Sequence, residues 1–160
     1  MTVNQLLIKV RQKLHDMSKL KYSDEELVYC LNNAIDKLSL ELADSKTPDF
    51  VKEFQITASK GVERPDDFIE FVGQYPIATT EQEDKVMMEL LDQEYPGSMI
   101  VRYFALRPKI RALTDKIPFY REWQTSRLIN YTVLEADPMQ EQTEQGAVAN
   151  GNNGSNTNYR

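Results

Sequence analysis

The first stretch of the chain carries apolar positions at helical spacing. Thr2 and Gln5 form the Ser/Thr-x-x-Glu/Gln pattern of a helix-capping box. Apolar residues then recur every three or four positions: Leu6, Leu7, Val10, Leu14 and Met17. This pattern predicts an amphipathic helix over about residues 2–17.

A second helix follows after a short linker. Ser23 and Glu26 form another capping box, and Asp24 and Glu25 suit the positive end of a helix dipole. The apolar stripe continues through Leu27, Leu31, Ala34, Ile35, Leu38 and Leu42. We predict a helix over about 24–43, packed beside the first helix because the linker is short.

The apolar period changes in the middle of the chain. Phe54 and Ile56 alternate with polar neighbours, as in a half-buried strand. Residues 68–72 and 99–105 are also rich in strand-forming types. The segment 86–91 fits either a short helix or a strand. We predict a β-rich middle over about 53–105.

Trp123, Tyr131 and Leu134 are helically spaced, which favours a last helix over about 119–136 although the letters LINYTVL have high β propensity. From Gly146 the chain is almost all Asn, Gly, Ser and Thr, so on its own this part is expected to be disordered. The predicted fold class is α+β, mainly helical. It is a bundle of two N-terminal helices and a C-terminal helix with a small β element, forming one domain over 1–137 and an extended polar arm over 138–160.

Composition limits the class of protein. The chain has 160 residues and a net charge of −6, which argues against a general nucleic-acid coat. The single Cys30 cannot form an internal disulfide and fits a reducing compartment. The amphipathic start does not resemble a secretory signal, and no apolar run is long enough for a membrane helix.

Residue types that usually carry catalysis are few. His15 is the single histidine, and Cys30 lies at the edge of an apolar stripe, so we expect a structural or surface histidine and an inert buried thiol. Glycine-rich phosphate loops and serine nucleophile elbows are absent from the sequence. The predicted sets of catalytic, cofactor-binding and metal-binding residues are therefore empty.

One short pattern imitates a metal-dependent nuclease. Pro65-Asp66, followed by Glu83-Asp84-Lys85, has two acidic positions that can hold Mg²⁺ and a lysine that can orient water. The second part lies in a polar run rather than on an apolar core strand. We interpret the pattern as a turn followed by a solvated acidic segment and regard nuclease chemistry as the weakest alternative.

Charge is divided into blocks along the chain. Residues 81–95 hold six acidic residues and one lysine, whereas residues 102–127 hold seven Lys or Arg against two acids. The basic block fits three readings: phosphate binding, a solvated face, or docking onto an acidic protein surface, which the acidic block of a neighbouring copy supplies. Opposed blocks on one chain suit head-to-tail contacts that form rings.

Several motifs, in order, resemble phage head-to-tail adaptor proteins, which lie between the portal ring and the tail. The early helix corresponds to YSDEELVYCLNNAIDKLSLEL. A strand, a turn and a Pro-Asp-Asp-Phe motif follow in EFQITASKGVERPDDFIEF. A Tyr-Phe strand corresponds to VRYFALRP, and the final helix to IPFYREWQTSRLINYTVLEA. The resemblance covers about residues 5–137. The acidic stretch at 79–97 departs from the minimal pattern as an insertion.

The resemblance implies a structural virion protein and no catalysis. It implies a homo-oligomeric ring, commonly of twelve copies, under the portal protein and above a tail or nozzle protein. Assembly is expected in the bacterial host cytoplasm, without a membrane, cofactor or specific binding of the DNA that passes through. The alternatives are another tail component, such as a tail completion or nozzle protein, and an intracellular binding module.

Two sets of residues follow from this hypothesis. The predicted partner interface consists of Arg102, Arg107, Lys109, Arg111, Arg121 and Arg127, with Asn150, Asn153, Asn156 and Tyr159 in the arm. The predicted acidic residues facing the DNA channel are Glu81, Glu83, Asp84, Glu89, Asp92 and Glu94. We expect the acidic set to repel DNA phosphates so that the genome slides.

Overall fold

The computed structural model describes residues 1–139, and these form two compact units. Unit 1 comprises Met1–Ala34 and the described residues from Lys109 onward. Unit 2 comprises Ile35–Pro108. Helix α2 (Asp24–Asp44) contributes residues to both units.

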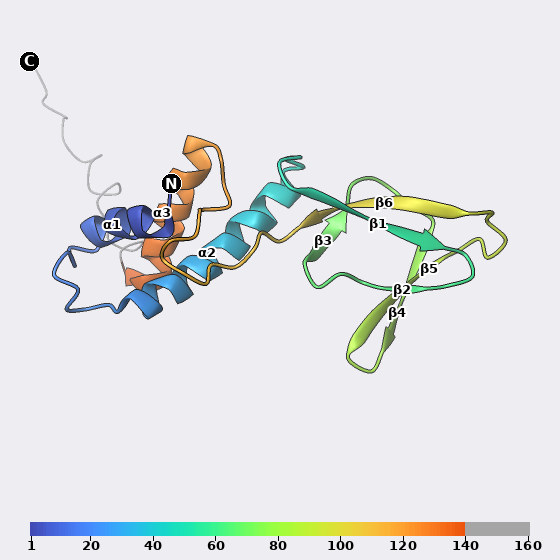
Figure 1. The fold of residues 1–160 in the computed structure, drawn as a ribbon, viewed down its shortest axis with the longest axis horizontal. Coiled ribbons are helices and arrows are strands. Elements are labelled where there is room, and N and C mark those ends of the chain that lie inside the picture. The colour runs from blue at the N-terminus through green and yellow to red at the C-terminus, as the bar shows by residue number, and fades with distance from the viewer. Residues whose placement is uncertain (140–160) are drawn as a thin grey trace, which may run out of the picture. The chain divides into compact units, whose positions relative to one another are not determined.

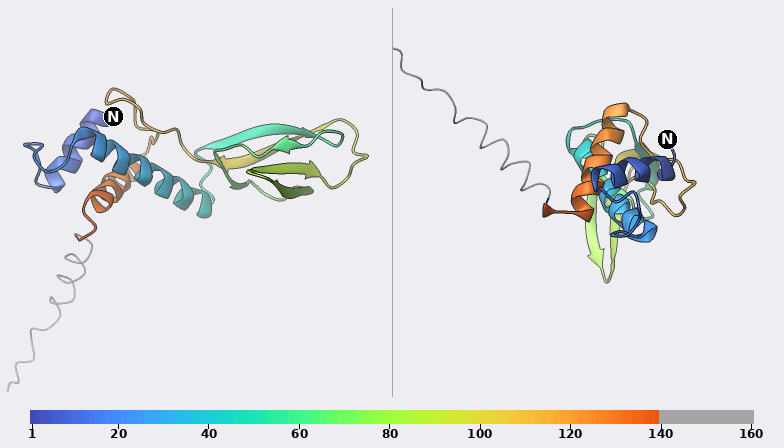
Figure 2. Two further views of the ribbon diagram at one scale, coloured as in Figure 1. Left: turned by 90° about the horizontal axis from the view of Figure 1, so that it is seen from below. Right: turned by 90° about the vertical axis from the view of Figure 1, so that its left-hand side faces the viewer.

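Unit 1 is helical. It contains α1 (Val3–Lys13), the first half of α2 and α3 (Glu122–Ala136), and α1 packs against α3 (Figures 1 and 2). Its buried apolar side chains include most of those that the helical spacing predicted, joined by residues of α3 and of the segment before it: Val3, Leu6, Leu7, Val10, Leu14, Leu27, Leu31, Ala34, Ile110, Ile117, Phe119, Leu128, Ile129 and Val133. Met17, also predicted on the apolar stripe, is 56% exposed. Both predicted capping boxes are confirmed.

Helix α1 ends earlier than predicted, at Lys13 rather than near Met17. His15 has a left-handed backbone with φ 53°, which stops the helix. The Asp16 carboxylate then accepts the backbone N–H groups of Leu20, Lys21 and Tyr22 at 3.0, 3.0 and 3.1 Å. These bonds hold the connection to α2 in one conformation.

A buried arginine fixes the same connection from the α1 side. Arg11 is only 3% exposed, and its Nη1 lies 2.8 Å from Asp16 Oδ2 and 3.0 Å from the Tyr22 carbonyl oxygen. Its Nη2 lies 2.7 Å from Asp24 Oδ1 at the start of α2. Arg11 therefore joins α1, the linker and α2 through charge-assisted hydrogen bonds.

The segment from Lys109 to Arg121 closes the free end of α1. The N–H groups of Val3 and Asn4 donate to the carbonyl oxygens of Asp115 and Leu113, each at 2.9 Å. These N–H groups belong to the first turn of the helix and have no partner within it. The segment thus supplies the acceptors that α1 needs and leads into α3.

Unit 2 is built on two antiparallel sheets of three strands each (Figure 1). The first has the order β1-β6-β3, and the second has the order β2-β5-β4. The strands are β1 (Val51–Thr57), β2 (Val62–Glu63), β3 (Phe68–Phe71), β4 (Ile77–Gln82), β5 (Lys85–Leu90) and β6 (Ser98–Ala105). One core joins side chains of both sheets, centred on Ile56, Met88, Leu90 and Val101.

The prediction of a mainly helical bundle is wrong. The described residues form an α+β fold with two three-stranded sheets in addition to the helices. The segment 86–91, which fitted either a helix or a strand, accounts for the second sheet. Residues 85–90 form strand β5, which pairs with both β2 and β4. Met88 and Leu90 are buried there while Glu89 between them is exposed, so the burial period is two and not 3.6.

Candidate interaction surfaces

The six basic residues of the predicted interface do not form one group. Arg102 and Arg107 belong to unit 2, whereas Lys109, Arg111, Arg121 and Arg127 belong to unit 1. Lys109 donates from Nζ to the Asn32 carbonyl oxygen at 3.3 Å, and the backbone N–H of Arg111 donates to Asp115 Oδ2 at 2.9 Å. Arg121 and Arg127 are exposed at the start and middle of α3.

Arg107, which belongs to unit 2, is buried and does not present its side chain to a partner. It is only 4% exposed, and its guanidinium carbon lies 5.3 Å from the centre of the Phe50 ring. Its backbone N–H donates to Ser39 Oγ at 3.3 Å. A planar guanidinium stacks well on an aromatic face, so Arg107 has a packing role within unit 2.

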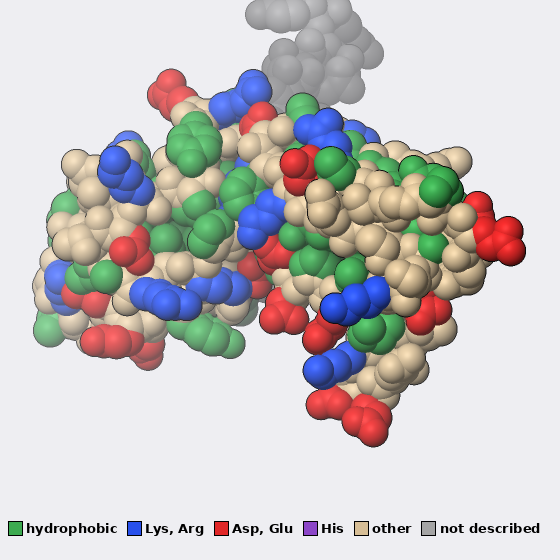
Figure 3. Space-filling model, turned by 45° about the vertical axis from the view of Figure 1, so that its right-hand side comes forward, with side chains coloured by type: hydrophobic (Ala, Val, Ile, Leu, Met, Phe, Trp, Pro, Cys, Tyr) green, Lys and Arg blue, Asp and Glu red, His purple; other side chains and the backbone are tan. Residues whose placement is uncertain are grey.

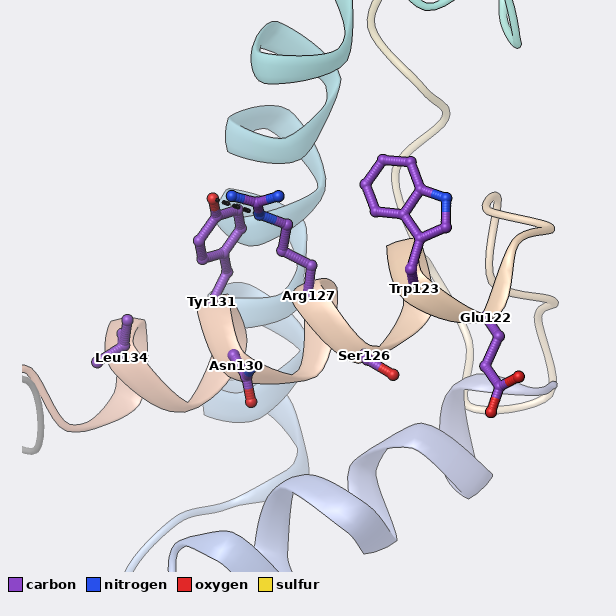
Figure 4. Close-up of a pocket in the computed structure, with 7 residues that line it drawn as sticks. All are labelled: Glu122, Trp123, Ser126, Arg127, Asn130, Tyr131 and Leu134. Atoms are coloured by element: carbon purple, nitrogen blue, oxygen red, sulfur yellow. Dashed lines mark hydrogen bonds between the residues drawn. The ribbon is translucent and has the colours of Figure 1, made fainter. Parts of the chain in front are cut away.

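Helix α3 carries an exposed groove that combines aromatic and cationic side chains. The groove is lined by Glu122, Trp123, Ser126, Arg127, Asn130, Tyr131 and Leu134. Trp123, Arg127 and Tyr131 rise from one side of α3, whereas Ser126 and Asn130 point to the other side, where α1 runs (Figure 4). We call Trp123, Arg127, Tyr131 and Leu134 the α3 face.

The α3 face is ordered by an internal contact. Arg127 Nε donates to Tyr131 Oη at 3.1 Å, and the guanidinium carbon lies 5.9 Å from the centre of the Tyr131 ring. Trp123 remains 47% exposed, one turn before Arg127. Trp, Tyr and Arg are the residue types that dominate the energetics of protein interfaces.

Trp123, Tyr131 and Leu134 predicted a helix by their spacing but not a binding surface. The residues that α3 buries are Gln124, Leu128, Ile129, Thr132 and Val133. These positions define the inward side of the helix, and Trp123 lies outside it. The three residues that predicted the helix therefore lie outside its buried set, which follows the spacing of Leu128, Thr132 and Val133 instead.

The acidic set lies in unit 2 at two places. Glu81, Glu83 and Asp84 lie at or beside the turn of the β4–β5 hairpin, where Gln82 pairs with Lys85. Figure 3 shows this hairpin projecting from unit 2 with acidic side chains at its end. Glu89 lies at the other end of β5, opposite Ala78, and Asp92 and Glu94 lie in the loop that follows. All six are exposed.

The nuclease pattern is not assembled as a metal site. Glu83 and Asp84 form the exposed hairpin turn, and Lys85 Nζ lies 3.6 Å from Glu63 Oε2 on the neighbouring strand β2. Asp66 is exposed in the turn before β3. Within residues 1–139 no group of three His, Cys, Asp or Glu side chains has the arrangement to hold a metal ion.

The two other candidate residues for chemistry have plain surroundings. His15 is exposed in the linker after α1. Cys30 is half-buried on α2 rather than fully buried, and burial, followed by the nearby Glu135 and Glu26 carboxylates, raises the pKa of its thiol. A raised pKa lowers the fraction of reactive thiolate.

Asn150, Asn153, Asn156 and Tyr159 lie outside the described residues. No protein-family model matches the chain, and no curated protein matches it. Among the helices of residues 1–139, none is long and apolar enough to cross a membrane.

Proposed function

We propose that the chain is a structural head-to-tail adaptor of a phage virion, which forms a ring under the portal and joins it to the tail. It acts without catalysis, by geometry and surface charge. The observation that carries this proposal is that two separate motifs of the adaptor resemblance meet in one structural cluster of unit 2.

The cluster joins the Pro-Asp-Asp-Phe motif to the Tyr-Phe strand. Asp67 Oδ1 accepts a hydrogen bond from Tyr103 Oη at 3.0 Å, and Asp67 Oδ2 pairs with Lys52 Nζ on β1. The Asp67 carbonyl oxygen accepts the Leu106 N–H at 2.7 Å. One aspartate therefore ties together the start of β3 and strands β1 and β6.

Aromatic packing completes the cluster. The ring of Phe68 lies 5.4 Å from that of Tyr103 and 5.0 Å from that of Phe71. Burial, and then the hydrogen bond to Asp67, raise the pKa of Tyr103 to about 12, so the phenol keeps its donor proton at neutral pH. Residues 36 positions apart in the sequence thus serve one structural purpose, which supports a resemblance of fold rather than a chance match of short strings.

Surface charge suits passage of DNA. Asp92 and Glu94 lie in an exposed acidic loop of unit 2, and the chain as a whole has a net charge of −6. On the channel side of a ring, such a loop repels phosphates and offers them no binding site. The remaining alternatives, a tail completion or nozzle protein and an intracellular binding module, differ from this proposal in location rather than in chemistry.

Electron microscopy tests the proposal. The full chain is co-expressed with the portal protein encoded in the same genome, and the purified complex is imaged. We expect a ring of additional density on the tail side of the portal. A chain that does not bind the portal, or that maps to a distal part of the tail in virions, contradicts the adaptor function.

A further inference from the structure

An oligomer with a repeated heterologous contact needs two different surfaces on each copy. The chain presents two surfaces of opposite character on separate units. The α3 face on unit 1 combines aromatic side chains with Arg127, and the end of the β4–β5 hairpin on unit 2 carries Glu81, Glu83 and Asp84. We propose that the acidic hairpin of one copy docks onto the α3 face of a second copy. This inference deepens the proposed function, because it assigns the contact that repeats around the ring.

The α3 face has the composition of a binding surface for an acidic segment. Its centre holds Arg127, whose positive charge attracts a carboxylate. The contact of Arg127 with Tyr131 fixes the direction of this side chain before a partner arrives. Trp123 and Tyr131 on either side supply broad apolar area at low entropic cost, because each has only two rotatable side-chain bonds. Arg121, exposed at the start of the helix, adds a positive charge that offsets Glu122, the acidic residue lining the groove.

The hairpin has the shape and charge of the matching partner. Its turn contains only Glu83 and Asp84 between paired strand residues, so the end is narrow. Lys85 is the cation closest in sequence to the turn, and its Nζ lies 3.6 Å from Glu63 Oε2 on β2. Thr79 and Thr80 of β4 are exposed and polar, so this part of the hairpin needs no apolar cover in the free chain. A short acidic projection can therefore enter a shallow groove without exposing apolar surface in the free chain.

The charges of the two surfaces make this pairing directional. Two acidic hairpins repel each other, whereas an acidic hairpin and the cationic Arg127 attract. A contact between two acidic hairpins is therefore disfavoured. When each copy receives one neighbour and enters another, the contact closes a ring or extends a chain of copies. In this arrangement Glu81, Glu83 and Asp84 serve the subunit contact, and Asp92 and Glu94 retain the channel role.

Sedimentation of the full chain, without portal, tests the contact. Two variants each disable one surface: Trp123→Ala with Arg127→Ala, and Glu81→Gln with Glu83→Asn and Asp84→Asn. We expect the wild type to self-associate with rising concentration, more strongly at low salt because the contact is between opposite charges. We expect each variant to raise the dissociation constant about tenfold or more, the scale of interface anchors.

Matched controls remove similar groups elsewhere. Tyr29→Ala removes an aromatic side chain that is 69% exposed on α2, and Glu89→Gln removes an exposed acid at the far end of β5. Both controls should associate like the wild type. Circular dichroism and the melting temperature establish that all variants are folded.

A mixing experiment separates this contact from one in which either surface pairs with itself. The α3-face variant keeps a working hairpin, and the hairpin variant keeps a working α3 face. A mixture of the two can form one junction only, so it should give dimers that grow no further, while each variant alone remains monomeric.

Four results overturn the proposal: a wild-type chain that is monomeric up to its solubility limit, variants that associate normally, a mixture that stays monomeric, or a mixture that forms long oligomers. Loss of association only when the chain is truncated after Pro138 also overturns it and assigns the contact to residues 139–160. If the chain self-associates through these surfaces but does not bind the portal, this contact is supported and the adaptor function is contradicted. If the chain binds the portal but lacks this contact, the adaptor function is supported and this contact is contradicted.

Discussion

At the scale of single residues, Arg11 has the largest structural effect in unit 1. It is 3% exposed and joins Asp16, Asp24 and the Tyr22 carbonyl oxygen. Arg11→Met keeps the apolar stem of the side chain but leaves Asp16 buried without its counter-charge. Removing one partner of a buried ion pair costs about 3–5 kcal/mol.

We therefore expect Arg11→Met to lower the free energy of unfolding by about 3 kcal/mol, measured by urea denaturation. Lys9→Met is the matched control, because Lys9 lies on the same helix and is exposed. The control should change stability by less than about 0.5 kcal/mol. Equal stability of the two variants would mean that the Arg11 network does not hold the linker.

The same network makes stability depend on pH. The Lys21 N–H, then the N–H groups of Tyr22 and Leu20 and the charge of Arg11, hold the pKa of Asp16 below its ordinary value against the opposing effect of burial. Hydrogen bonds from Arg11 and Lys19 lower the pKa of Asp24. Both carboxylates bind protons more weakly in the folded chain than in the unfolded chain. Their contribution is therefore present above the unfolded pKa of about 3.9 and is lost as the pH falls through the folded values.

We expect unfolding titrations from about pH 7 down to about pH 3 to show a steep loss of stability below about pH 4. Asp16→Asn should flatten that loss while lowering stability at neutral pH. Asp44→Asn, at an exposed position near the end of α2, should leave the profile unchanged. An Asp16→Asn profile parallel to that of the wild type would assign the acid sensitivity to other groups, such as Asp115, whose pKa the Arg111 and Ala112 N–H groups lower.

At the scale of elements, local signals predicted the helices reliably and the strands incompletely. The capping boxes at Thr2 and Ser23 are short-range patterns, and the structure confirms both. Strand β5 was ambiguous because its sequence, KVMMEL, has too few residues to separate a period of two from one of 3.6. Pairing with β2 and β4 decides its conformation, and that pairing is not visible in the segment itself.

In α3 the local residue types favour a strand, but the segment forms a helix. Its β-branched residues favour a strand by propensity, yet helical spacing buries Leu128, Thr132 and Val133 on one side. Thr132 Oγ1 also donates to the Leu128 carbonyl oxygen at 2.8 Å, so its hydroxyl is satisfied within the helix. Packing outweighs propensity here.

The β4–β5 turn is strained at one position that can be improved. Glu83 has φ 54°, a left-handed conformation that costs most residues energy and that Asn and Gly adopt more readily. We expect Glu83→Asn to stabilise the chain by about 0.5 kcal/mol, measured as a rise in melting temperature. Glu81→Gln, on the adjoining strand, is the control for loss of charge alone and should have a smaller effect. A destabilising Glu83→Asn would indicate that the Glu83 carboxylate supports the turn.

At the scale of the whole molecule, the sequence predicted one domain over 1–137, and the described residues divide into two compact units. The division was hard to see because α2 is one continuous helix whose residues before and after position 34 belong to different units. The chain also leaves unit 1 after Ala34 and returns to it only at Lys109. Composition and periodicity describe residues that are near one another in the sequence, so they do not predict that residues after position 108 pack with residues before position 35.

Removal of the predicted arm over 138–160 tests its role in assembly. The buried apolar residues of unit 1 end with Val133, and the backbone N–H of Asp137 still donates to the Val133 carbonyl oxygen at 2.8 Å. A chain truncated after Pro138 keeps this bond and every buried side chain of both units named above. We therefore expect its melting temperature to stay within about 2 °C of that of the full chain, since the change in stability is that of a surface alteration.

If the arm anchors the ring as predicted, the truncated chain should bind the co-expressed portal more weakly than the full chain does. A shorter truncation after Asn158, which removes only Tyr159 and Arg160, tests whether the terminal tyrosine is the anchor. Weaker binding in both truncated chains would assign the anchor to these last two residues, and weaker binding only after the longer truncation would assign it to residues 139–158. Portal binding that is unchanged in both truncated chains would assign the contact to residues 1–138.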